Sequence, residues 1–132
     1  MAPQSTDVTA GTNATALHYN NLRADVNKGL RTNTTVTYGA TVNFDLSLGN
    51  VFTVTLNGNP TFTVSNGTVD QFFIVNVIQS AGGSNTITWF TTIKWPNGVT
   101  PTMTPAANKK DKFGFQVTGA GTYDGSVIGQ NL

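Results

Sequence analysis

The 132-residue chain contains no cysteine and no glutamate, and its only histidine is His18. Without cysteine it can form neither a disulfide nor a thiolate metal site. Without glutamate, the paired carboxylates of sugar hydrolysis would have to come from six scattered aspartates. A lone histidine builds neither a catalytic triad nor a zinc site, and no phosphate-binding or dinucleotide-binding motif occurs. We therefore expect no catalytic residues, no metal site and no cofactor.

Charge is also scarce, since charged residues make up 10% of the chain and the net charge is +1. Typical soluble domains carry roughly 25% charged residues. The densest cationic group is Lys109, Lys110 and Lys112 around Asp111, and it is most simply a solvated loop before a strand, with an anionic partner as the alternative. Because the cations form no stripe, we expect neither nucleic acid nor an anionic membrane as a partner.

Long hydrophobic runs are missing as well. No window approaches the roughly 18 apolar residues that a membrane-spanning helix needs. Residues 1–11 have neither the basic start nor the apolar stretch of a secretory signal peptide. The sequence therefore predicts a soluble protein that is made in the cytoplasm, and an extracellular location would need a route such as host lysis.

Threonine and asparagine supply the polarity that charge does not, with 23 and 15 residues. Threonine is β-branched and favours strands. Hydroxyls and amides also cost less to desolvate than ions do. This composition favours a β-rich body with an uncharged polar surface that can pack against identical neighbours.

Residues 1–33 are expected to form an N-terminal arm with one short helix. Thr15 is a candidate N-cap for a helix over 16–28, and Gly29 is a candidate C-terminal residue. Three residues of this helix form a narrow apolar seam: Tyr19, Leu22 and Val26. A helix this short is marginal in isolation. The seam must therefore pack either on the chain's own sheet or, as a candidate oligomer contact, on copies of itself from other subunits, and fraying of the helix is the third alternative.

Residues 34–132 show the alternating apolar pattern of strands separated by turns. The pattern predicts an all-β fold, specifically a jelly-roll-like antiparallel β-sandwich of about eight strands. Asn57-Gly58 predicts a hairpin between the strands on either side of it. The predicted inward-facing residues are Val42, Phe44, Leu46, Leu48, Phe52, Val54, Leu56, Phe62, Val64, Phe113, Phe115 and Val117.

Two further runs complete the predicted core. Residues 71–79 are apolar on both parities, which predicts a strand that is covered on both faces. Residues 86–95 alternate, although Phe90 interrupts the pattern and indicates either a bend or two short strands. Trp89 and Trp95 share a face with isoleucines, which favours core packing over stacking on a sugar. Tyr38 and Tyr123 are the remaining candidates for ligand-stacking aromatics.

The order of these pieces resembles a β-sandwich module of tailed-phage virion proteins of the tail-fibre, tail-tip and head-decoration types. The matching pieces are TVNFDLSLGNVFTVTL, NGNPTFTV, DQFFIVNVIQ, SNTITW, IKWPNGVTPTMTPAANKKDKFGFQV and GTYDGSVIGQNL. The leader TAGTNATALHYNNLRADV also looks like the helix-bearing segment ahead of such modules. Where the family usually has glycine before the glutamine of the long strand, this chain has Asp70.

The resemblance implies a non-enzymatic structural subunit of a virion, in a tail fibre, a tail tip or a capsid decoration. It also implies a homo-oligomer, most often a trimer, whose partners are its own copies and other virion proteins. The alternative is a carbohydrate-binding or host-attachment module that binds a glycan of the host surface. An architecture of this kind identifies no receptor.

Overall fold

In a computed structural model of the chain, the described residues are 33–132. They contain eight strands and one short 3-10 turn, Pro96–Gly98. The strands are β1 Asn33–Thr35, β2 Thr41–Asp45, β3 Val51–Thr55, β4 Thr61–Ser65, β5 Phe72–Ile78, β6 Ile93–Lys94, β7 Lys110–Gly119 and β8 Thr122–Gly129. The predicted all-β class is confirmed for this part of the chain. The predicted arm and helix, with Tyr19, Leu22 and Val26, lie outside the described residues.

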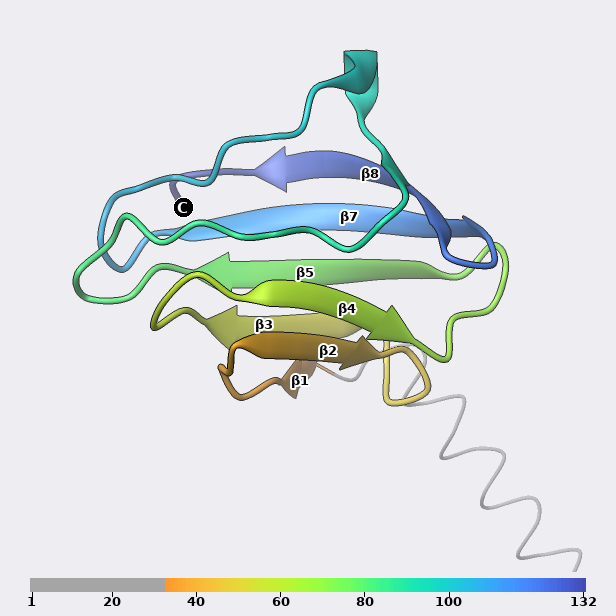
Figure 1. Cartoon of the computed structure of the whole chain (residues 1–132), viewed down its shortest axis with the longest axis horizontal. Coiled ribbons are helices and arrows are strands. Elements are labelled where there is room, and N and C mark those ends of the chain that lie inside the picture. Colours follow the sequence, from red (N-terminus) through yellow and green to blue (C-terminus); the bar gives the residue numbers. More distant parts are fainter. Residues whose placement is uncertain (1–32) are drawn as a thin grey trace, which may run out of the picture.

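The strands form a mixed six-stranded sheet in the order β1-β3-β5-β7-β8-β6 and a two-stranded sheet of β2 and β4 (Figure 1). Strand β3 pairs in parallel with β1 and β5, and β2 pairs in parallel with β4. Only β5-β7 and β7-β8 are antiparallel, while β6 pairs in parallel with β8. The prediction of an antiparallel jelly roll is therefore wrong for the first five strands.

The cause of this difference is that the chain crosses between the two sheets at every connection from β1 to β5. The predicted hairpin at Asn57-Gly58 is accordingly wrong, because β3 and β4 belong to different sheets. A two-residue type I′ turn needs positive φ at both central residues, and neither Asn57 nor Gly58 has it. Leu56 instead continues along β5 through a hydrogen bond from its N–H to the Ile78 carbonyl, 2.8 Å long. The side chain of Leu56 is 1% exposed, so its burial favours the crossing over the local turn.

Parallel pairing in register also explains the use of asparagine and threonine. On the six-stranded sheet the Thr53 hydroxyl donates to Asn33 Oδ1 at 3.1 Å and accepts from Asn76 Nδ2 at 3.3 Å. On the smaller sheet the Thr63 hydroxyl donates to Asn43 Oδ1 at 2.9 Å. Short polar side chains on neighbouring strands thus pair with one another and keep these parts of the surface uncharged.

The core lies between the two sheets. Phe44 of β2 contacts Phe62 of β4 and Phe52 of β3, with ring centroids 4.9 and 5.5 Å apart. Most of the predicted inward positions are buried, but Val64 is half-buried and Leu48 is 45% exposed. Leu48 was wrongly assigned to the core because β2 ends at Asp45, so the alternation no longer applies.

The tryptophan segment is not the long strand that the alternation predicts. Only an isolated bridge at Thr88, which pairs with Thr61 of β4, and the two-residue strand β6 are formed there. Two short β segments therefore lie on either side of Phe90. The sequence predicted either this arrangement or a bend. Trp95 is 9% exposed and Trp89 packs against Phe113 at 4.8 Å. The prediction that both tryptophans serve the core is confirmed.

Strand β5 lies in the middle of the six-stranded sheet, but it is not covered on both faces by the described residues. Phe73, Val75 and Val77 face inward and are no more than 1% exposed. Phe72 faces outward and is 65% exposed. The prediction that this strand is covered on both faces is wrong at the Phe72 end of β5, because no described segment packs over the outer face there.

We predict that Phe44→Ala and Leu48→Ala, two truncations from one alternating run, differ strongly in effect. Phe44→Ala leaves a cavity between the sheets and should lower the free energy of unfolding by about 3–5 kcal/mol. Leu48→Ala removes a half-exposed side chain and should change it by about 0.5 kcal/mol or less. Urea unfolding followed by tryptophan fluorescence measures both, and equal losses would contradict the placement of Leu48 outside the core.

Candidate functional site

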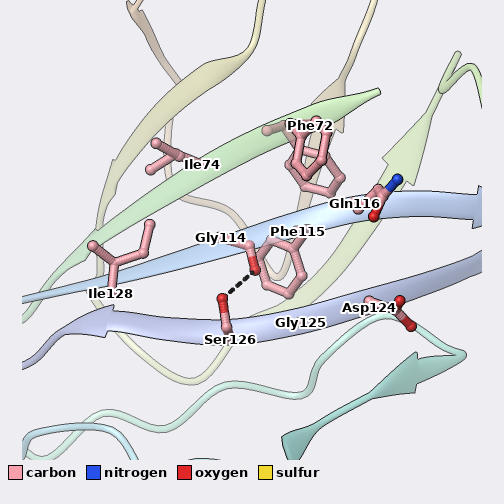
Figure 2. Close-up of a pocket in the computed structure, with 10 residues that line it drawn as sticks. Phe72, Ile74, Gly114, Phe115, Gln116, Asp124, Gly125, Ser126 and Ile128 are labelled. Atoms are coloured by element: carbon pink, nitrogen blue, oxygen red, sulfur yellow. Dashed lines mark hydrogen bonds between the residues drawn. The ribbon is translucent and has the colours of Figure 1, made fainter. Parts of the chain in front are cut away.

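An apolar groove crosses the outer face of the six-stranded sheet over β5, β7 and β8 (Figure 2). Its volume is about 400 Å³, within the range of small ligand or side-chain pockets. Phe72 and Ile74 of β5 form one wall, Ile128 of β8 forms the other, and Gly114 of β7 lies between them. Phe72 is 65% and Ile128 54% exposed. The groove therefore presents apolar surface that is only partly covered within residues 33–132.

The strand register sets the arrangement of the groove. Phe72 pairs with Gln116, which pairs with Asp124, so an aromatic ring, an amide and a carboxylate form one row. The next row contains Ile74, Gly114 and Ser126. Because Gly114 has no side chain, Ile128 can lie close over the backbone of β7 in this second row. A Cβ at this position would lie 3.0 Å from Ile128 Cδ1, so any larger residue would displace the wall.

Two of the three polar side chains at the rim form hydrogen bonds within residues 33–132, and the third does not. Gln116 Nε2 donates to Asp70 Oδ1 at 3.3 Å, and Ser126 Oγ donates weakly to the Gly114 carbonyl at 3.5 Å. The exposed carboxylate of Asp124 has no hydrogen bond or ion pair with any other residue in 33–132. Asp124 is thus an available negative charge at the end of an apolar groove.

Next to the groove, Asn76 is a buried polar residue with an unused acceptor. It follows Ile74 on the outer face of β5 and is 7% exposed. Its Nδ2 donates to Thr53, whereas its Oδ1 has no hydrogen-bond partner among the described residues. A buried acceptor without a hydrogen-bond partner destabilises the fold. This region of the outer face therefore keeps one unsatisfied hydrogen-bond acceptor, the Oδ1 of Asn76.

The aromatic residues predicted to stack on a ligand lie elsewhere. Tyr123 is 7% exposed, and its ring packs edge-on against Phe90 at 4.9 Å. Desolvation by burial raises the pKa of its hydroxyl. The ring of Tyr123 therefore packs in the core, and its role in ligand stacking stays a prediction. Tyr38 is half-buried with its hydroxyl end against Gly58, and its role in ligand binding stays a prediction.

The sequence did not single out Phe72 as a site residue. The signal was nevertheless present, because 71–79 is apolar on both parities and only one parity can face a single core. Gly114 on the neighbouring strand was a second signal, since a glycine inside a strand marks close approach of another group. Their juxtaposition depends on the β5-β7 register, which the sequence did not specify.

The other aspartates of residues 33–132, which are Asp45, Asp70 and Asp111, accept hydrogen bonds that hold turns and strand ends. Asp45 accepts hydrogen bonds from the Ser47 hydroxyl at 2.6 Å, from Asn66 Nδ2 at 2.8 Å and from the Ser47 N–H at 3.0 Å. These bonds lower the pKa of Asp45 and close the turn after β2. Asp70 accepts the Gln116 bond in the connection before β5. In residues 33–132 no three acidic, histidine or cysteine side chains gather as metal ligands would.

Asp111 is the one fully buried carboxylate of the described chain, at 0% exposure. Burial acts to raise its pKa, but hydrogen bonds outweigh burial and hold the pKa below the ordinary value. The donors are the Thr104 N–H at 2.7 Å, the Asn131 N–H at 3.0 Å and Gln130 Nε2 at 3.0 Å. Asp111 therefore ties the segment before β7 to the C-terminal end of the chain.

None of the helical structure in residues 33–132 has the length or hydropathy needed to cross a bilayer. Comparison of the chain with protein-family models, with curated proteins and with solved structures found no match. The function is therefore inferred from the chemistry of the surface itself, and in particular from the apolar groove on the outer face.

Proposed function

We propose that the chain is a non-enzymatic structural subunit of a phage virion, part of a tail fibre, a tail tip or a capsid decoration, and that it assembles as a homo-oligomer. The observation that carries the proposal is the outer-face groove, where Phe72 and Ile128 expose apolar surface on an otherwise nearly uncharged body. Exposed apolar surface of this kind marks an interaction site. Among the described aspartates, Asp45, Asp70 and Asp111 accept hydrogen bonds that hold turns and strand ends.

The composition of the surface supports assembly with identical copies. The hydroxyl and amide ladders on both sheets are neutral, so bringing two such surfaces together removes few ions from water. A net charge of +1 also gives little repulsion between copies. The resemblance to tailed-phage virion modules supports the same reading, and a trimer is the order that it implies.

Assembly through the groove is tested by Phe72→Ser combined with Ile128→Ser. Each replacement removes an apolar side chain whose burial contributes about 1.5–3 kcal/mol, so we expect association to weaken at least about tenfold. Size-exclusion chromatography with light scattering measures the mass over a dilution series. Circular dichroism confirms that the fold is kept.

The matched control is Leu48→Ser combined with Val99→Ser, which removes two exposed apolar side chains outside the groove. This variant should keep the mass of the unaltered chain. A strictly monomeric unaltered chain would contradict the homo-oligomer, and an unchanged mass for the Phe72 and Ile128 variant would contradict assembly through the groove.

The virion assignment is tested on particles of the phage that encodes the chain. We expect quantitative mass spectrometry of gradient-purified particles to find the chain at a fixed copy number relative to the major capsid protein. Host proteins that carry over with the particles provide the background level. Detection in the infected lysate but not in purified particles would contradict a structural role in the virion.

A carbohydrate-binding or host-attachment module is the second candidate, favoured by one specific observation. The exposed ring of Phe72 lies in a row with Gln116 and Asp124, and stacking rings beside hydrogen-bonding groups suit sugars. Against it, the walls of the groove are largely aliphatic. A structural subunit should show no saturable binding on a glycan array. Saturable binding that is lost in Phe72→Ala and kept in Tyr38→Ala would favour the carbohydrate module instead.

A further inference from the structure

The groove runs along β7, with β5 side chains on one side and β8 side chains on the other (Figure 2). A narrow apolar trough of this shape accepts the apolar stripe of an amphipathic helix. The sequence predicts one such stripe in the chain, the seam of Tyr19, Leu22 and Val26 on the helix over 16–28. This segment precedes the described residues and joins them at Asn33, on an edge strand of the same sheet.

We propose that the seam of one subunit docks into the outer-face groove of a neighbouring subunit, so that the oligomer is tied together by exchanged N-terminal segments. The inference rests on the proposed homo-oligomer and names the partner of its groove. In the proposed contact Leu22 lies against Ile128 in the row of Gly114, with Tyr19 and Val26 on either side of it along β7. The contact covers Phe72, Ile74 and Ile128.

The rim of the groove carries charges of both signs. Asp124 is an exposed carboxylate without a hydrogen bond or ion pair in residues 33–132, and its register neighbour on β6 is Lys94. Arg23 is four residues from Tyr19 in the predicted helix, a spacing that would put it beside the seam. The proposal assigns Arg23 as a further cation for Asp124.

The length of the connection favours a neighbour over the chain's own groove. The five residues from Lys28 to Asn33 span at most about 17 Å when fully extended. Strand β1 is three strand spacings from β7, about 14 Å. A helix along β7 with Leu22 over Gly114 places Lys28 about 9 Å further along the groove and one packing layer, about 8–10 Å, above the sheet. The combined distance of about 19 Å exceeds the reach of this connection.

The symmetry of the contact is consistent with a closed ring. The proposed contact joins two different surfaces, the seam of one subunit and the groove of the next. Each subunit therefore donates one N-terminal segment and binds one. Such a head-to-tail contact closes into a ring when the rotation between subunits allows it, and a trimer is one such ring. Groove against groove would instead be self-complementary and would give a dimer.

Disulfide trapping tests the contact, and the absence of cysteine makes the background clean. The full-length double variant Leu22→Cys with Ser126→Cys is oxidised after assembly and run on a non-reducing gel. We expect covalent dimers and larger species up to the subunit number of the oligomer. Mixing and refolding the two single-cysteine variants should give covalent dimers containing one chain of each kind, because each bond then joins two chains.

The control Ala24→Cys with Ser126→Cys places the first thiol on the opposite side of the helix and should give little crosslinking. A fast-migrating monomer with an internal disulfide would overturn the proposal, because it would place the seam in its own groove. An intact oligomer without specific crosslinks would overturn it while leaving the proposed function standing. A monomer by light scattering would overturn the proposed function itself.

A charge exchange gives a second measurement that does not depend on cysteine. Arg23→Asp should weaken association by about two- to fivefold, as expected for an exposed ion pair, and combining it with Asp124→Arg should restore association. The control Arg31→Asp changes the same charge outside the predicted helix and should not be rescued by Asp124→Arg. A lack of rescue for Arg23→Asp would overturn the assigned orientation of the seam.

Discussion

The structure depends on the packing of aromatic rings between two sheets whose strands the chain supplies alternately. Phe44 lies between Phe52 of the large sheet and Phe62 of the small one. Trp89 extends the contact to Phe113 of β7. Because β2 and β4 belong to one sheet and β1, β3 and β5 to the other, each crossing of the chain adds inward residues to both sides of this core. Parallel pairing within each sheet follows from the alternation.

The alternation of side chains along each strand determines the outer surface. A strand can place only one parity toward the core, so the residues of β5 next to the buried Phe73 and Val75 must face outward. At Phe72, Ile74 and Ile128 these outward residues are apolar, whereas on β1 and β3 they are the asparagine and threonine of the ladders. The outer face of the six-stranded sheet therefore has a neutral polar part on β1 and β3 and an apolar groove over β5, β7 and β8, with Lys94, Lys112 and Asp124 beside the groove. The burial of Phe73 and the exposure of Phe72 therefore have the same cause, because neighbouring residues of a strand point to opposite faces of the sheet.

Much of the local structure was predictable from the sequence. Period-2 alternation identified the buried residues of β2, β3 and β7. The pairing was not predictable, because local turn chemistry at Asn57-Gly58 indicated a hairpin that the burial of Leu56 and Phe62 in a shared core overrides. Tyr123 was assigned to ligand binding although its parity places it beside Phe90.

The candidate site was the least predictable part. Its walls come from β5 and β8 and its floor from β7, so the groove exists only through the register of three strands. The scarcity of charge is plain in the sequence, whereas the seam of Tyr19, Leu22 and Val26 stays a prediction because it lies outside the described residues. The groove itself could be recognised only after Gly114 was placed between Phe72 and Ile128.

Hydroxyl-radical footprinting of Phe72 in the full-length chain tests the central claim most directly. If the groove is the contact between subunits, the oxidation rate of Phe72 should fall several-fold in the assembled protein relative to the dissociated one, while that of the exposed Val99 stays constant. If Phe72 is oxidised equally fast in both states, the groove is open in the assembly and the account is contradicted.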